Sequence, residues 1–179
     1  MRIGIIAVGR SGGYNLGEWL GYETRSKFIH EPYKNGFDTN GKNIVVKWLY
    51  TEWLGIQNPP QMDKWIGLWR EDIRECAISH LKAEQSGNWR KGYQIDSEWI
   101  NKMDGMIDIT QKWINKSTTE LKGLPQIELM ISYEGIYNRG DDIQKLTDYL
   151  GIRAPKYQWM LHPSLRLRNM GERTKKQLI

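Results

Sequence analysis

Short continuous apolar runs alternate with stretches of helical period along most of the chain. Five stretches are predicted as strands, over residues 3–8, 27–30, 43–50, 65–70 and 127–133, and the continuous apolar run 3–8 is typical of a buried parallel strand. Four stretches show helical spacing of apolar residues, and they cover residues 15–20, 72–84, 95–121 and 141–150. This alternation predicts an α/β fold in which helices flank a parallel sheet.

Turn-forming and capping residues set the expected ends of these elements. Asp72 is predicted to cap the helix over 72–84, and Gly151 is predicted to end the last helix. Gly17 and Gly21 weaken the first helical stretch, so we expect that helix to be short. No strong period follows Pro155, and an irregular tail is predicted over 155–179.

Length and composition favour one globular domain over residues 1–179. Apolar residues make up 39% of the chain, with nine Trp and nine Tyr. Cys76 is the only cysteine, so no intrachain disulfide can form, and its helical surroundings predict a packed thiol. We expect no secretory signal, because the N-terminal apolar run is short and enters a glycine turn, and no apolar run reaches membrane-spanning length. We expect a cytoplasmic protein without membrane association.

The charge balance narrows the class of ligand. The chain carries a formal net charge of +5 and has a sequence pI near 9.2. A modest basic excess suits a small anionic ligand, although it also suits an ordinary solvated surface. The basic residues are too dispersed to predict nucleic-acid binding.

The most informative stretch lies at residues 2–16, where an apolar run enters a glycine-rich turn and then the start of a helix. In such a turn, backbone N–H groups point at a bound anion, and the helix dipole adds partial positive charge. The stretch therefore predicts a phosphate or sulfate site.

A Walker A loop, G-x-x-x-x-G-K-[ST], is one candidate for this site. The spacing fits from Gly4 through Gly9 to Arg10 and Ser11, with Arg in place of Lys. However, Gly4 lies inside the apolar run rather than at the turn, and no strand-end Asp is convincingly placed to hold magnesium. The turn is therefore assigned to the run that begins at Gly9, and a P-loop kinase of small substrates remains the alternative enzyme.

Three segments resemble the sulfotransferases, most closely the bacterial trehalose 2-sulfotransferase-like and other carbohydrate sulfotransferases. Residues 10–16, Arg-Ser-Gly-Gly-Tyr-Asn-Leu, resemble the loop that holds the 5′-phosphosulfate. Residues 68–79, continued by Ala-Glu-Gln-Ser-Gly-Asn-Trp at 83–89, look like the segment that binds the 3′-phosphate. Residues 131–151 are similar to the family's Tyr-Glu strand and the helix that ends in Leu-Gly. The likeness covers about residues 1–152.

The resemblance implies a three-layer P-loop-type fold and a specific donor. That donor is 3′-phosphoadenosine-5′-phosphosulfate (PAPS), the product is 3′-phosphoadenosine-5′-phosphate (PAP), and no metal is required. The implied donor-binding residues are Arg10, Ser11, Gly12, Gly13, Tyr14, Asn15, Arg70, Ser79 and Tyr133. Arg70 and Ser79 would hold the 3′-phosphate, and Arg10 with the turn would hold the 5′ end. The alternative for Arg70 is a surface ion pair with an acid such as Glu71 or Asp72.

The resemblance also names candidates for the chemical step. Arg10 would stabilise the leaving phosphate, as expected where catalysis is mostly positioning and charge stabilisation. Cytosolic members carry a catalytic His two residues after a strand Lys; here Lys47 is present but Leu49 stands at the His position. Carbohydrate-type members use a Glu after the second strand, so Glu31 is the first choice for the base and His30 the second.

The chain departs from the family in two respects. Gly13 and Tyr14 stand where the loop has small hydroxyl residues, and the chain is short. Three interpretations stay open: a minimal catalytic core, an acceptor site completed by a second copy in a homodimer, or a nucleotide-binding module without turnover. The resemblance alone suggests a small-molecule or carbohydrate hydroxyl as the acceptor.

Overall fold

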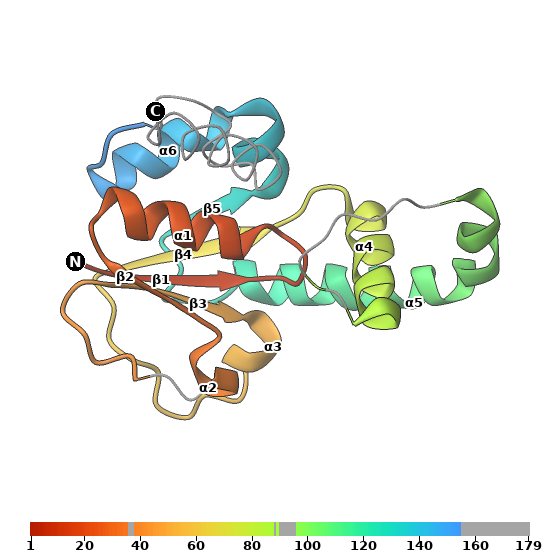
Figure 1. Cartoon of the computed structure of the whole chain (residues 1–179), viewed down its shortest axis with the longest axis horizontal. Coiled ribbons are helices and arrows are strands. Elements are labelled where there is room, and N and C mark those ends of the chain that lie inside the picture. Colours follow the sequence, from red (N-terminus) through yellow and green to blue (C-terminus); the bar gives the residue numbers. More distant parts are fainter. Residues whose placement is uncertain (36–37, 88, 90–95, 155–179) are drawn as a thin grey trace, which may run out of the picture.

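The predicted α/β architecture is confirmed. The computed structural model describes residues 1–35, 38–87, 89 and 96–154, and the predicted tail over 155–179 lies outside them. Five parallel strands form one sheet in the order β2-β3-β1-β4-β5 (Figure 1). The strands are β1 (Arg2–Ala7), β2 (Lys27–His30), β3 (Ile44–Leu49), β4 (Lys64–Trp69) and β5 (Leu129–Ser132). Each lies within two residues of its predicted ends.

The four predicted helices are present. The helical elements of the described residues are α1 (Gly13–Glu23), α2 (Pro32–Asn35), α3 (Tyr50–Trp53), α4 (Ile73–Ser86), α5 (Ser97–Lys122), the π-helical turn η1 (Gly135–Arg139) and α6 (Asp141–Leu150). Asp72 caps α4 by accepting the Glu75 N–H at 2.8 Å, and Gly151 ends α6 in the left-handed region, both as predicted. The pieces α2, α3 and η1 were not predicted, because four or five residues are too few to show a period.

The expectation of a short first helix is wrong. Helix α1 runs for eleven residues and continues through Gly17 and Gly21. A side chain at Gly17 would overlap the ring of Phe28, and one at Gly21 would lie 3.2 Å from the Phe28 Cβ. The two glycines therefore let β2 pack closely against α1, and this packing compensates for their low helix propensity.

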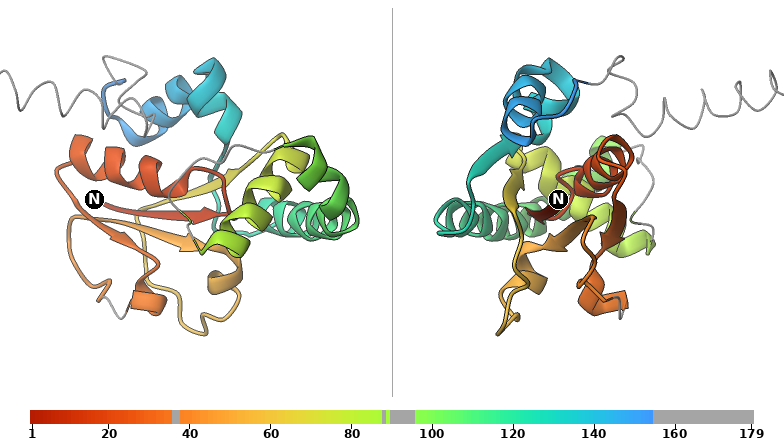
Figure 2. Two further views of the ribbon diagram at one scale, coloured as in Figure 1. Left: turned by 45° about the vertical axis from the view of Figure 1, so that its right-hand side comes forward. Right: turned by 90° about the vertical axis from the view of Figure 1, so that its left-hand side faces the viewer.

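Helices cover both faces of the sheet, with a separate apolar core on each face (Figure 2). On one face, Leu16 and Trp19 of α1 and Leu146 of α6 pack against strand residues such as Ile5. On the other face, α4 and α5 pack against β1, β3 and β4. Of the helices that the structure describes, none, the 26-residue α5 included, is long and apolar enough to cross a membrane.

The two faces are covered by helices that follow neighbouring strands. Strands β1 and β4 are adjacent, yet α1 follows β1 on one face and α4 follows β4 on the other. The chain therefore leaves the carboxyl ends of these two strands in opposite directions. Such a switch point opens a crevice outside the sheet, and ligands of open parallel α/β sheets bind there. The glycine turn and Arg70 lie on its two sides.

Candidate functional site

The glycine turn joins the central strand β1 directly to α1. Arg10 and Gly12 both lie in the left-handed region, with φ of 63° and 79°. Ser11 is buried, and its hydroxyl donates to the Val8 carbonyl, so it braces the turn from inside. The first N–H groups of α1 have no partners within the helix, which is the arrangement that receives anions.

Arg10 brings the turn into contact with α4. Its Nε donates to Ser79 Oγ at 2.9 Å, and its Nη1 donates to the Trp89 carbonyl. Two segments that were predicted to hold opposite ends of one ligand therefore meet, although 69 residues separate Arg10 from Ser79. The charge of Arg10 lies over α4 in this arrangement.

Tyr133 connects the other side of the turn to Arg70. The Arg70 guanidinium carbon lies 4.6 Å from the centre of the Tyr133 ring. A Cβ on Gly12 would lie 3.0 Å from that ring and 2.6 Å from Tyr137, so only glycine lets the turn approach these tyrosines. The Tyr137 hydroxyl donates to the Gly12 carbonyl at 2.9 Å, and burial raises its pKa far above the usual value.

Arg70 does form ion pairs, as the alternative predicted, but the acids are not Glu71 or Asp72. Arg70 pairs with Glu134, whose Oε1 lies 3.3 Å from Nε, and more distantly with Glu75 at 3.9 Å. The Arg70 side chain is 13% exposed. Glu71 instead pairs with Arg139 and Asp72 caps α4, so neither takes the charge of Arg70. The guanidinium therefore stays at the crevice beside Tyr133.

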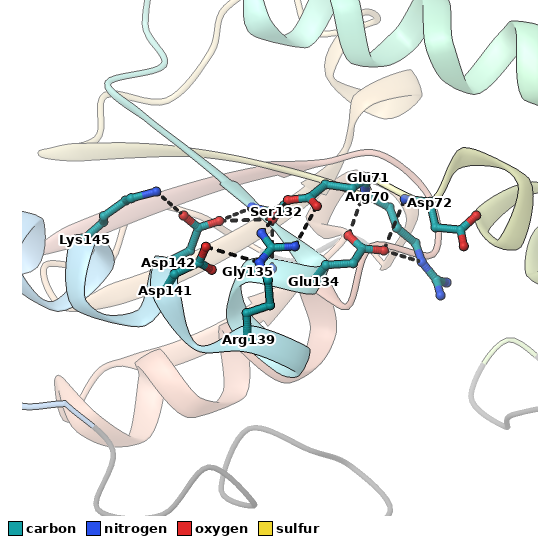
Figure 3. A network of polar contacts seen from close by, with 10 residues as sticks. All are labelled: Arg70, Glu71, Asp72, Ser132, Glu134, Gly135, Arg139, Asp141, Asp142 and Lys145. Atoms are coloured by element: carbon teal, nitrogen blue, oxygen red, sulfur yellow. Dashed lines mark hydrogen bonds and ion pairs between the residues drawn. The ribbon is translucent and has the colours of Figure 1, made fainter.

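Glu134, the partner of Arg70, belongs to a set of side chains that we call the carboxylate network: Glu71, Ser132, Glu134, Arg139 and Asp142 (Figure 3). Glu134 accepts the N–H groups of Glu71 at 2.8 Å and Asp72 at 3.3 Å, which fixes the chain after β4. Hydrogen bonds from Arg139 and Ser132 lower the pKa of Glu71 from 4.5 to about 2. These hydrogen bonds therefore keep Glu71 ionised.

Asp142 anchors the end of β5 within this network. Its Oδ2 accepts the Ser132 N–H at 2.8 Å, and the Ser132 hydroxyl accepts the Gly135 N–H at 2.9 Å. Burial acts to raise the pKa of Asp142, but hydrogen bonds from Lys145 and Ser132 lower it overall. These contacts hold Tyr133, the next residue along, in place.

The two base candidates lie at the end of β2, beyond β3. Glu31 is buried and has φ of 46°, an unusual conformation for a residue with a side chain. Its Oε1 accepts from Lys47 Nζ at 2.6 Å and lies 3.3 Å from His30 Nε2. Lys47 is 4% exposed. The site therefore contains a buried ion pair at a strained backbone position.

Tyr14 and Gly13 are the two departures from the sulfotransferase loop, and the structure gives each a local reason. Tyr14 points away from the turn, packs edge-on against His30 at 5.0 Å between ring centres, and donates to Glu18. A Cβ on Gly13 would lie 3.0 Å from the Cβ of Ala7 and 3.2 Å from Cε of Lys47. The absence of a side chain at Gly13 therefore leaves room for the aliphatic part of the Lys47 side chain. Asn15, half-buried, follows on the first turn of α1.

Sequence reasoning missed His80, whose ring lies over the start of the turn. A Cβ on Gly9 would lie 3.5 Å from its Nδ1, and the ring centre lies 5.3 Å from that of Trp89 and 5.4 Å from that of Trp113. Burial lowers its pKa. A lone histidine in a helical pattern gives no signal for such a position.

Cys76 supports the same end of the turn. It is buried, as predicted for a packed thiol, and its Sγ donates to the Gly9 carbonyl at 3.1 Å. Burial raises its pKa to about 12, which keeps it protonated. Cys76 therefore stabilises the turn and is not a nucleophile at neutral pH.

Within the described residues, no group of three or more His, Cys, Asp or Glu side chains is arranged to hold a metal ion. Comparison with protein-family models and with curated protein sequences finds no match to this chain.

Proposed function

We propose that this protein is a sulfotransferase, built on a P-loop-type fold, that moves a sulfuryl group from PAPS to a hydroxyl acceptor. The central observation is the meeting of the two predicted anion-binding segments at the β1–β4 switch point. Arg10 contacts Ser79, while the Tyr133 ring contacts Arg70 and lies close enough to Gly12 that a Cβ there would be 3.0 Å from it. A donor that carries anions on both the 3′ and the 5′ oxygens of its ribose needs such a pair of sites.

The fold proposal has topological support. The glycine turn follows the central strand, a helix begins directly after it, and parallel strands lie on both sides. This is the setting in which P-loop domains hold phosphates. The left-handed turn residues and the N-terminus of α1 supply the same kind of backbone donors.

The 3′-phosphate is assigned to Arg70 and Ser79. A guanidinium offers a planar fork of donors that matches phosphate oxygens, and the Ser79 hydroxyl adds a further hydrogen bond. Arg70 and Ser79 lie at the start and in the middle of the same β4–α4 segment, with Glu75 between them. The Tyr133 ring, beside Arg70, is assigned to the nucleoside.

In the proposed reaction the acceptor oxygen attacks sulfur, and the bond from sulfur to the 5′-phosphate oxygen breaks. The electron pair of that bond stays on PAP, where Arg10 and the turn N–H groups stabilise it. The acceptor proton passes to Glu31, or to His30 as the second choice, and general base catalysis contributes about 10²–10⁴-fold. The acceptor class, a small molecule or carbohydrate, follows from the resemblance described above.

A transfer assay tests the proposal directly. Purified protein is incubated with PAPS labelled with ³⁵S and a panel of hydroxyl acceptors that includes mono- and disaccharides. Labelled product from any acceptor, with release of PAP, is the expected result. Magnesium-dependent transfer from ATP labelled at the γ-phosphate would instead identify a small-substrate kinase. Tight PAP binding without turnover on any acceptor would identify a nucleotide-binding module.

A further inference from the structure

Tyr14 is a bulky residue beside the glycine turn that the proposed donor does not explain. Its backbone lies in the first turn of α1, next to the expected anion, but its ring packs against two rings of β2. The centre of the Tyr14 ring lies 5.5 Å from that of Phe28 and 5.0 Å from that of His30, and both pairs are edge-on. Since β2 is an edge strand, the ring lies on the opposite side of β1 from Arg70.

The Tyr14 ring is fixed in place and still accessible. Its hydroxyl donates to Glu18 Oε1 at 3.0 Å, one turn further along α1, and the two ring contacts hold it on the side of β2. Even so, Tyr14 is 38% exposed. A tyrosine that is already immobilised offers a large contact surface and loses little conformational entropy when a ligand binds. Tyr14 is therefore suited to bind a ligand by stacking.

Direct contacts connect this ring to the proposed base. His30 packs against the Tyr14 ring, and its Nε2 lies 3.3 Å from Glu31 Oε1. Glu31 is buried, the side chain of His30 is 31% exposed, and Tyr14 is more exposed still. Exposure thus increases outward from the base. An acceptor in solution therefore approaches Glu31 past His30 and Tyr14.

The groups around the Tyr14 ring indicate the class of ligand. A sugar ring carries C–H groups on one face, and their partial positive charge is attracted to the negative face of an aromatic ring. The hydroxyls of the sugar need polar partners, and Glu18 and His30 flank the Tyr14 ring. A flat phenol would instead bind best between apolar walls. One aromatic face with polar groups beside it therefore favours a sugar.

We propose that Tyr14 is the stacking platform for a sugar acceptor. One face of the sugar lies on the Tyr14 ring, and a hydroxyl at its rim reaches Glu31, or His30 as the second choice, to give up its proton. This inference rests on the proposed function, and it assigns the Tyr14 side chain to the acceptor rather than to the donor. It gives a reason for a tyrosine where the sulfotransferase loop has a small hydroxyl residue.

Sugar binding can be measured without turnover. Glucose, maltose and cellobiose are titrated into the protein, with and without PAP, and binding is followed by saturation-transfer NMR. Tyr14→Ala removes the ring and should weaken the tightest of these sugars at least about fivefold, the lower end of what stacking on an aromatic ring contributes. Tyr14→Phe keeps the ring and should stay within about twofold. Tyr22→Ala, an exposed tyrosine near the far end of α1, is the matched control and should also stay within about twofold.

A second measurement uses the ring itself, so it does not depend on the folding of Tyr14→Ala. In protein labelled with ¹³C-tyrosine, the ring signal that is missing from Tyr14→Phe belongs to Tyr14. Addition of the sugar should shift this signal, whereas the signal missing from Tyr22→Ala should stay in place. PAP affinity is the third readout, and Tyr14→Ala should keep it within about twofold because the ring points away from the turn.

Four outcomes would overturn the proposal: no binding of any of the three sugars, an equal loss in Tyr14→Ala and Tyr22→Ala, a loss of PAP affinity in Tyr14→Ala as large as the loss of sugar affinity, or tighter binding of 4-nitrophenol than of the sugars at Tyr14. A wild-type protein that binds PAP no better than adenosine 5′-phosphate would contradict the proposed function. Sugar binding at Tyr14 would still be scored from the variants, so the two failures are distinguishable.

Discussion

Two acidic groups at the carboxyl edge of the sheet differ in what holds them. Glu134, in the carboxylate network, and Glu31, at the end of β2, have similarly buried side chains, 12% and 11% exposed. Glu134 has an ordinary helical φ of −66° and accepts two main-chain N–H groups. Glu31 has φ of 46° and pairs with the ammonium of Lys47.

The proposed reaction gives these two acids different parts, because Glu134 holds the backbone and Glu31 is assigned as the base. Glu134 bonds to the backbone after β4, so the chain itself depends on its carboxylate (Figure 3). Glu31 pairs with Lys47, a residue type with a flexible aliphatic stem, and its left-handed backbone conformation costs free energy. Burial alone would treat the two acids alike, whereas their partners and backbone conformations assign them different roles.

The largest expected effect is on turnover in Glu31→Gln. Loss of the base should lower kcat by about 10²–10⁴-fold without loss of PAP affinity. The amide keeps an oxygen that can accept from Lys47, so the fold should persist. Initial rates with labelled PAPS and a thermal melt measure both quantities, and unchanged turnover would move the base to His30 or elsewhere.

The same substitution in the carboxylate network, Glu134→Gln, should lower the stability of the fold rather than the rate of turnover. The amide cannot satisfy both main-chain donors and Arg70 together, and about 1–3 kcal/mol of unfolding free energy should be lost. Denaturant unfolding of the two variants side by side tests the contrast. Equal stability losses in both would remove the distinction between the two acids.

Arg70→Ala should weaken PAP binding by about tenfold to a hundredfold, the range for hydrogen bonds to a charged group. Binding of adenosine 5′-phosphate, which lacks the 3′-phosphate, should stay within about twofold. Arg74→Ala on α4 is the matched control, because Arg74 is exposed and pairs with Asp104. If Arg70→Ala weakens both ligands equally, the assignment of the 3′-phosphate is wrong.

Two left-handed glycines, Gly12 and Gly87, should differ in how much stability an alanine substitution costs. Gly12→Ala forces a Cβ to within 2.6 Å of Tyr137 at φ of 79°, whereas Gly87→Ala at φ of 64° has nothing within 4 Å. We expect Gly87→Ala to cost about 1–2 kcal/mol from the backbone alone. Gly12→Ala should cost more, since the tyrosines must also shift. Melting curves that show equal losses would contradict the close packing of the turn.

The smallest expected effect is on the free energy of unfolding at acid pH. Because the pKa of folded Glu71 is about 2 and its usual value is 4.5, Glu71 stabilises the fold above pH 4.5. That contribution is lost as the pH falls from 4.5 towards 2. Arg139→Ala should flatten this part of the curve, modestly because Arg139 is 46% exposed and screened. An unchanged slope would show that Arg139 does not hold the Glu71 pKa down.

The central strand β1 could be predicted because a buried parallel strand is a continuous apolar run, and the short edge strand β2 was also predicted with its observed ends. The length of α1 could not, since Gly17 reads as a helix breaker until Phe28 is seen packing against it. Propensity is local, and the compensating contact comes from another element.

The sequence names residues of the candidate site but not the contacts between them. The glycine turn, Arg70 and Ser79 were named from the sequence, whereas the Arg10–Ser79 contact depends on α4 crossing the end of β1. Lys47 was noted as a strand lysine, yet its pairing with Glu31 requires the order β2-β3-β1. The sequence indicates the position of Tyr137 only weakly. Tyr137 follows Tyr133 by four residues, a spacing that places two side chains on the same face of a helix.

The preference of the wild-type protein for a 3′-phosphorylated nucleotide tests the central claim most directly. Calorimetric titration with PAP, with adenosine 5′-phosphate and with ATP plus magnesium compares the three ligands under one set of conditions. Because one set of residues is assigned to the 3′-phosphate and another to the 5′ anion, we expect PAP to bind at least tenfold more tightly than either of the other ligands. Equal or tighter binding of ATP would contradict the sulfotransferase proposal.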